Sequence, residues 1–226
     1  MKRLSFWSQA YEIGLKDLRI EGRSGEVLNI TIPFGAVALL LIPLSIAADR
    51  PLLATIGPGM FWVVTLLFGM LVTFRQSATE TVANREMMVL LGVDPAAQFA
   101  GRVITSFLLL LVFEGVLAPL TIILYNPDPV SGAGVLILVL VLLAIGLALI
   151  GTLASGITAG LRSRNTLAPL LVAPLALPLL VGASQTYEAL VQESSILNPV
   201  LLLVAVVLGL AVVGVLTARF LEEAAR

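Results

Sequence analysis

The chemistry open to this chain is limited first by two residue types that it lacks. The sequence contains no cysteine and no histidine. Without cysteine there are no disulfide bonds, iron–sulfur clusters, thiolate zinc sites or cysteine nucleophiles. Without histidine the commonest metal ligand and the commonest general base are both missing. Most enzymes that work inside a membrane need one of these groups, so we do not expect an enzyme.

One acidic residue, Glu114, stands in the middle of a long apolar run. An ionisable group at the centre of a bilayer costs on the order of 3 kcal/mol on insertion scales. We therefore expect a protonated carboxyl, or one that faces a polar cavity or a subunit boundary. Two roles stay open, namely a group on a substrate path or gate, and a neutral carboxyl that hydrogen-bonds a neighbouring helix. No second carboxylate is near it in the sequence, so acid–base catalysis built on Glu114 is the least favoured alternative.

The composition indicates a membrane protein that binds neither nucleic acid nor nucleotide phosphates. Of 226 residues, 59% are hydrophobic and 12% are charged, whereas about 25% are charged in a soluble domain. A net charge of −1 without a basic cluster excludes an affinity for nucleic acid. The phosphate-binding pattern G-x-x-x-x-G-K-[S/T] is absent, as are G-x-S-x-G and H-E-x-x-H. The chain therefore has no sign of its own ATPase, hydrolase or metalloprotease site.

Six apolar runs are predicted to cross the membrane as helices, which makes the fold class an all-α integral membrane protein with one transmembrane domain over residues 1–226. The predicted spans are residues 30–48, 53–74, 103–125, 134–161, 167–183 and 196–220. Each exceeds the roughly 20 residues that a helix needs to cross the hydrocarbon core, except 30–48 and 167–183, which lie within the tolerated range of about 17–25. The span 134–161 is long enough to extend beyond the bilayer. With both termini in the cytoplasm, twelve basic residues face inward and only Arg50 faces outward. This asymmetry predicts the orientation.

Residues 1–28 are predicted to contain an amphipathic helix at the cytoplasmic membrane interface. Its apolar side chains recur at three- and four-residue steps, and so do its basic ones. They are Trp7, Tyr11, Leu15 and Leu18 on one face, and Lys16, Arg19 and Arg23 on another. A solvated cytoplasmic helix is the alternative.

Residues 75–102 form the longest polar interruption and are predicted to be a cytoplasmic loop that binds a soluble partner. Gly92, Asp94 and Pro95 predict a short helix over about 76–91, a break, and a new helix from Pro95. The residues singled out for partner contact are Glu80, Arg85, Glu86, Leu90 and Leu91.

Two further patterns concern helix packing. The predicted span 134–161 carries a stripe of small residues that includes Gly151, Gly156 and Gly160. Such a stripe allows another helix to approach closely, either from this chain or from a second one. Pro169, Pro174 and Pro178 are predicted to kink the fifth span, which suits a moving gate. Proline is also simply frequent in membrane helices, so the gate is one of two interpretations.

Several colinear stretches carry a likeness to a known family. They are residues 16–23 (KDLRIEGR), 114–120 (EGVLAPL), 151–153 (GTL), 159–164 (AGLRSR) and 167–171 (LAPLL), followed by Pro174 and Pro178. Together with the span pattern, they resemble the haem exporter B family of cytochrome c maturation, which is part of the type-2 ABC exporter permeases. The 75–102 loop is poorer in acidic residues than that family leads us to expect.

The resemblance implies a permease subunit in the bacterial cytoplasmic membrane that works with a separate ABC ATPase docked on the 75–102 loop. It also implies a haem-handling membrane protein, a membrane-anchored periplasmic haem chaperone, and a second permease copy or a pseudo-symmetric partner. Only methionine and tyrosine remain as weak iron ligands, so no cofactor is expected to bind stably and haem would be a transient cargo. Whether haem itself moves, or ATP-driven motion releases the haem-loaded chaperone, stays open. The alternatives are an exporter permease for a drug, lipid or polysaccharide, and a membrane scaffold that transports nothing.

Overall fold

The computed structural model describes residues 5–45, 50–78, 92–158 and 164–223, and in these ranges it contains helices and no strand. The helices are α1 (Phe6–Ser24), α2 (Glu26–Ser45), α3 (Arg50–Ala78), α5 (Pro95–Tyr125), α6 (Ala133–Thr158), α7 (Arg164–Val191) and α8 (Leu197–Glu223). Six of these, all but α1, are long and apolar enough to cross a membrane. The predicted fold class of six spanning helices is thereby confirmed.

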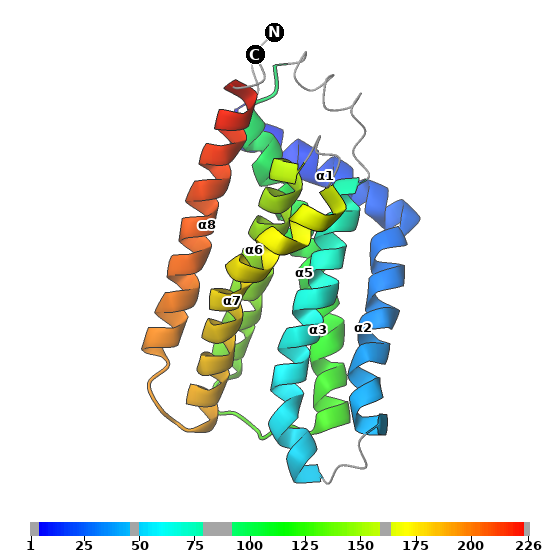
Figure 1. The fold of residues 1–226 in the computed structure, drawn as a ribbon, viewed down its shortest axis with the longest axis vertical. Helices are drawn as coiled ribbons and strands as arrows, with labels where there is room; N and C mark the ends of the chain where they lie inside the picture. Colours follow the sequence, from blue (N-terminus) through cyan, green and yellow to red (C-terminus); the bar gives the residue numbers. More distant parts are fainter. Residues whose placement is uncertain (1–4, 46–49, 79–91, 159–163, 224–226) are drawn as a thin grey trace.

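The six long helices stand side by side, and α1 lies across one end of the bundle (Figure 1). We call this end the α1 end; it also holds the beginning of α5 and the end of α8. The opposite end, the far end, holds the α5–α6 and α7–α8 connections. Both described ends of the chain therefore lie on the same side of the bundle, as an even number of spans requires. The cytoplasmic side remains assigned by the charge pattern alone.

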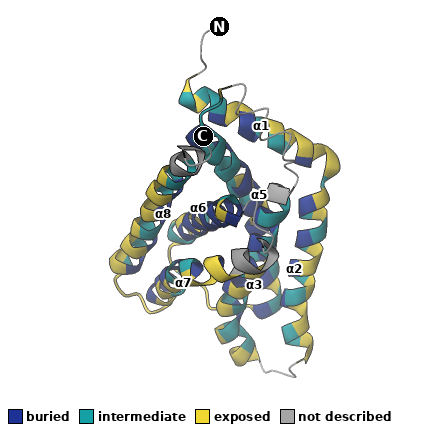
Figure 2. Ribbon diagram, turned by 45° about the horizontal axis from the view of Figure 1, so that its top comes forward, coloured by how far each residue is buried: buried dark blue, intermediate teal, exposed yellow. Residues whose placement is uncertain are grey.

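Helix α6 forms the centre of the bundle. It packs against α3, α5, α7 and α8, and Figure 2 shows it mostly in the colour of buried residues. Helices α2 and α8 lie at the periphery and turn large apolar side chains outward, among them Phe34, Leu44, Leu208 and Val212. A spanning helix in lipid shows this arrangement, because lipid tails are as apolar as the core and can cover such residues.

Several helices extend beyond the apolar runs that marked them in the sequence. Helix α7 continues to Val191, although the apolar run ends near residue 183, and α3 continues to Ala78. Polar residues do not end a helix if their hydroxyls bond within it, and Thr186 Oγ1 donates to the Gly182 carbonyl at 2.7 Å. Hydropathy therefore measures the length in contact with lipid, whereas caps and turn residues determine the length of the helix.

Helix α1 is amphipathic, and the aromatic side chains of its predicted apolar face point away from the bundle. Trp7 and Tyr11 are 72% and 61% exposed, while Ala10, Ile13 and Gly14 are buried. Ala10, Ile13 and Gly14 rather than the aromatic residues therefore face the bundle, where α1 rests directly on α5. The exposed aromatic rings are left to face the surroundings, where an amphipathic helix at a membrane interface places them.

Candidate functional site

The part of the 75–102 loop that was singled out for partner contact lies outside the described residues. Glu80, Arg85, Glu86, Leu90 and Leu91 all fall within residues 79–91. The end of the loop is described and confirms the predicted break. Gly92 has a φ of 68°, and the Asp94 side chain caps α5 by accepting from Ala96 N at 2.9 Å, with Pro95 as the first helical residue.

The beginning of α5 is fastened to α1 by a contact that we call the α1–α5 clamp, made by Gln9, Gly14, Asp94, Gly101 and Thr105. Gln9 Oε1 accepts a hydrogen bond from Asp94 N at 2.9 Å. Thr105 Oγ1 lies 3.2 Å from the Gly14 carbonyl oxygen, to which it donates. A Cβ atom at Gly101 would lie 2.7 Å from the Ala10 carbonyl oxygen. The two helices therefore touch through their backbones, in the last part of the 75–102 loop and just beyond it.

The clamp was missed by the sequence reasoning. The signal that could have found it is a glycine inside each of the two helices, Gly14 in α1 and Gly101 in α5. Glycine is unfavourable inside a helix by roughly 1 kcal/mol, so such a position often has a packing reason.

Helix α1 is also joined to the beginning of α2. Glu21 is buried, and its Oε1 accepts from Val27 N at 2.9 Å and from Leu28 N at 3.0 Å. Gly25, with a φ of 59°, ends α1 in the left-handed conformation and allows this sharp turn. The carboxylate thus satisfies two of the free N–H groups at the start of α2 and lies at the positive end of its dipole. Helix α1 consequently bridges the first turns of α5 and α2.

We expect Glu21→Ala to destabilise this junction, because it leaves two buried N–H groups without an acceptor. The free energy of unfolding should fall by about 1–3 kcal/mol. The measurement is the thermal unfolding midpoint of the detergent-solubilised protein, with the exposed Glu12→Ala on the same helix as control. Equal midpoints for the two variants would contradict the role given to Glu21.

Glu114 lies near the middle of α5 and is 1% exposed. Within the described chain neither of its carboxyl oxygens has a hydrogen-bond partner. The interpretation of Glu114 as a carboxyl that hydrogen-bonds a neighbouring helix therefore finds no partner among the described residues. Its role on a substrate path or gate remains a prediction.

The neighbour of Glu114 on α3 follows from the packing register. A Cβ atom at Gly69 would lie 3.0 Å from Leu110 Cδ2, so these residues face each other across α3 and α5. The two helices run in opposite directions (Figure 1). Thr65, four residues before Gly69, is therefore at the depth of Glu114, four residues after Leu110, and on the facing side. The Thr65 hydroxyl is also buried without a hydrogen-bond partner among the described residues.

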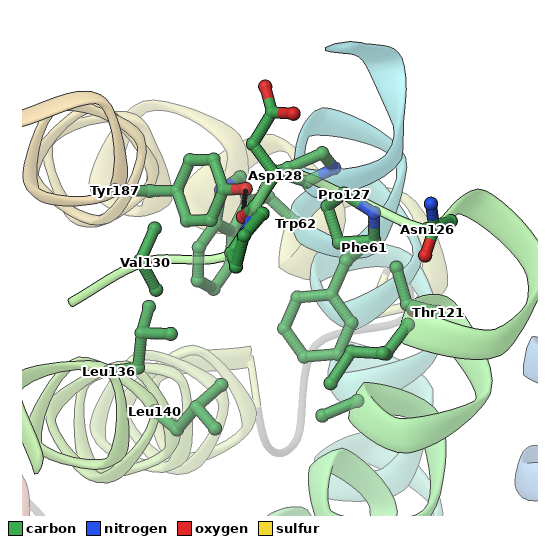
Figure 3. A pocket seen from close by; sticks show the side chains of 14 residues that line it. Phe61, Trp62, Thr121, Asn126, Pro127, Asp128, Val130, Leu136, Leu140 and Tyr187 are labelled. Atoms are coloured by element: carbon green, nitrogen blue, oxygen red, sulfur yellow. Dashed lines mark hydrogen bonds between the residues drawn. The ribbon is translucent and has the colours of Figure 1, made fainter. Parts of the chain in front are cut away.

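A pocket of about 460 Å³ opens at the far end between α3, α5, α6 and α7. Figure 3 shows Phe61, Trp62 and Tyr187 around it, with Leu136 and Leu140 of α6 opposite. Ala118 lines the pocket from α5, one helical turn from Glu114 on the same face. Glu114 and Thr65 therefore lie just beneath the inner end of the pocket. The sequence reasoning did not find this pocket, because its lining comes from four separate helices.

The small-residue stripe and the prolines have different surroundings. A Cβ atom at Gly151 would collide with the Thr73 side chain, so Gly151 packs closely on α3 within the chain. Gly156 has no such neighbour, and Gly160 lies outside the described residues. Pro169, Pro174 and Pro178 all fall in α7, which changes direction along its first half in Figure 1. Whether α7 moves as a gate stays a prediction.

No group of three or more acidic residues that could hold a metal ion exists in the part of the chain that the structure describes. The six spanning helices define a multi-pass α-helical membrane protein with polar groups buried between its helices.

This chain belongs to the CcmB protein family, whose model matches residues 8–225. Heme exporter protein B of Haemophilus influenzae is 31% identical over 180 residues, which cover 79% of this chain and 80% of the relative. Heme exporter protein B of Pseudomonas aeruginosa is 29% identical over 173 residues, covering 75% and 76% of the two chains. The likeness thus extends over most of the bundle.

Proposed function

We propose that this chain is the membrane permease subunit of a haem-export complex that serves cytochrome c maturation in the bacterial inner membrane. Membership of the CcmB family, together with two relatives named heme exporter protein B, supports this function. The six spanning helices fit a multi-pass permease. The sequence contains no nucleotide-binding loop, so ATP hydrolysis belongs to a separate ABC ATPase subunit.

The ATPase docks on the 75–102 loop, and the α1–α5 clamp carries its motion into the bundle. The observation that supports this step is the position of the clamp. It includes Asp94 and Gly101, which belong to the last part of the loop, and continues to Thr105 further along α5. Because α1 also holds the start of α2 through Glu21, a displacement of the loop would move α1, α2 and α5 together.

The partners beyond the ATPase are a haem-handling membrane protein, a periplasmic haem chaperone and a second permease copy or a pseudo-symmetric subunit. Haem is a transient cargo in this proposal, since the chain offers neither histidine nor cysteine to ligate iron. The same absence favours energy coupling or brief apolar passage over a stable haem complex.

The experiment that tests the function is a haem-stained gel of c-type cytochromes from cells without this gene, with the gene, and with the gene restored. The covalent-haem bands should disappear on deletion and return on restoration. Unchanged bands in the deletion strain would refute the maturation role and leave an exporter of another substrate as the best explanation.

The docking of the ATPase is tested separately by site-specific cross-linking in cells that contain the whole complex. A photoreactive amino acid at Glu80 or Arg85 should capture an ABC ATPase, whereas the same probe at the far-end residue Glu188 should not. Capture from neither loop position would contradict the docking site and leave the maturation role untouched.

A further inference from the structure

The far-end pocket has no role in the coupling described above, although its position in the bundle is specific. It lies at the boundary between the lipid-facing surface and the far-end connection. Its lining residue Ile122 is 60% exposed and apolar, as expected of a side chain that faces lipid. Asn126 and Asp128, at the same mouth, are exposed and polar. A molecule in this pocket would therefore extend from the hydrocarbon region to the polar surface.

The interior of the pocket is apolar and contains no positive charge. Its walls are mostly aromatic and aliphatic side chains together with prolines, and among the described residues no lysine or arginine lines it. Asp128 is the one charged lining residue, and Figure 3 shows its carboxylate pointing away from Leu136 and Leu140. Burying a carboxylate here would be costly, because nothing in the lining compensates its charge. An uncharged ligand is therefore favoured over an anionic one.

Trp62 adds a polar group to this apolar lining. Its side chain is 6% exposed, and its indole Nε1–H has no acceptor within the described chain. A buried donor without a partner is uncommon and costs about 1–3 kcal/mol. An oxygen atom carried by a ligand in the pocket would satisfy it. The indole can only donate, so this ligand atom must be an acceptor such as a carbonyl oxygen.

We propose that the far-end pocket is a binding site for the acyl ester of a membrane lipid, with the chain between Phe61, Leu136 and Leu140 and the ester carbonyl accepting from Trp62 Nε1–H. A volume of about 460 Å³ is within the usual range for a small apolar ligand. The ester of a lipid is uncharged and lies where hydrocarbon meets headgroup, as the pocket does. A haem porphyrin is also largely apolar, but it carries two carboxylates, and the described lining offers no cation to pair with them.

The test uses Trp62 as a contact reporter. The chain has two tryptophans, so Trp7→Phe leaves Trp62 alone. The full-length protein is reconstituted in phosphatidylglycerol bilayers whose acyl chains are brominated, because bromine quenches tryptophan only on contact. Trp62 should be strongly quenched despite its burial, and this quenching should disappear when Ala118→Phe or Leu140→Phe fills the pocket from α5 or α6. Val116→Phe, on the exposed side of α5, is the matched control and should leave the quenching unchanged.

Protoporphyrin binding to the same variants in unbrominated bilayers, followed by the porphyrin's own absorbance, gives the second arm. The proposal expects the porphyrin affinity of both filled variants to equal that of Val116→Phe. Either of two results would overturn it, namely a Trp62 that stays unquenched in brominated lipid, or a tenfold loss of porphyrin affinity confined to the filled variants. The second result would assign the pocket to the cargo. The cytochrome phenotype of the deletion strain is read separately, so failure here leaves the proposed function in place.

Discussion

Replacing Gly101 by leucine should abolish cytochrome c maturation while leaving the protein in the membrane. A Cβ atom at this position would lie 2.7 Å from the Ala10 carbonyl oxygen and 2.9 Å from Ile13 Cβ. Neither is the end of a flexible side chain, so α1 itself must move away from α5. Overpacking of this kind typically costs about 1–3 kcal/mol, which the rest of the bundle can tolerate. The haem-stained gel and the amount of membrane-inserted protein are the two readouts.

The matched control for Gly101→Leu is Gly209→Leu in α8. Gly209 is exposed, and a Cβ atom there would meet nothing within 4 Å, so normal cytochrome bands are expected. Co-purification of the ATPase separates the explanations for the Gly101 variant. Retained ATPase with lost cytochromes supports the clamp as a transmitter of motion, whereas normal cytochromes in Gly101→Leu would show that export does not need the clamp.

The path of the chain through the membrane could be predicted because each span is determined locally. An apolar run of sufficient length must become a helix in lipid, since every backbone polar group has to be satisfied within the segment. The break before α5 was predictable for the same reason, because Gly92, Asp94 and Pro95 act on their own neighbours. Neither inference depends on which helix packs against which.

The clamp and the pocket were beyond the sequence because they depend on contacts between distant segments. Gln9 and Asp94 are 85 residues apart, and nothing in either segment identifies the other as its partner. The face of α1 that rests on α5 was out of reach for a related reason. Gly14 and Gly101 let the two backbones approach closely, so that Ala10 and Ile13 are buried while Trp7 and Tyr11 stay exposed.

Glu114 combines a feature that the sequence predicts with one that only the packing of the helices determines. Its position in the middle of a span follows from the sequence, whereas its surroundings follow from the packing of α5 on α3. The register places Glu114 and Thr65 at one depth, and neither side chain has a hydrogen-bond partner among the described residues. Two unsatisfied polar groups at one depth weaken the bundle at this point. A bundle that only had to be stable would do better with apolar residues there.

Glu114→Leu should therefore stabilise the isolated protein and at the same time stop cytochrome c maturation. Removing an unpartnered buried carboxyl should raise the free energy of unfolding by about 1–3 kcal/mol, seen as a higher thermal unfolding midpoint in detergent. Loss of the haem-stained bands in the same variant would show that the carboxyl serves export, and Glu114→Gln, which keeps a polar group, should retain part of the activity. Normal cytochromes in Glu114→Leu would contradict a role on the path, and a lower midpoint would show that Glu114 has stabilising partners.

The pairing of Glu114 with Thr65 is tested by combining Thr65→Val with Glu114→Leu. Residues in contact usually show a coupling energy of about 0.5–3 kcal/mol, whereas independent sites add. We expect coupling here, because the register places both side chains on facing sides of α3 and α5 at one depth. Thr55→Val, an exposed threonine on the same helix whose hydroxyl bonds Pro51 within α3, is the matched control and should be additive with Glu114→Leu. Coupling of Glu114 with Thr65, together with additivity of Glu114 with Thr55, would show that Glu114 and Thr65 interact across the α3–α5 contact.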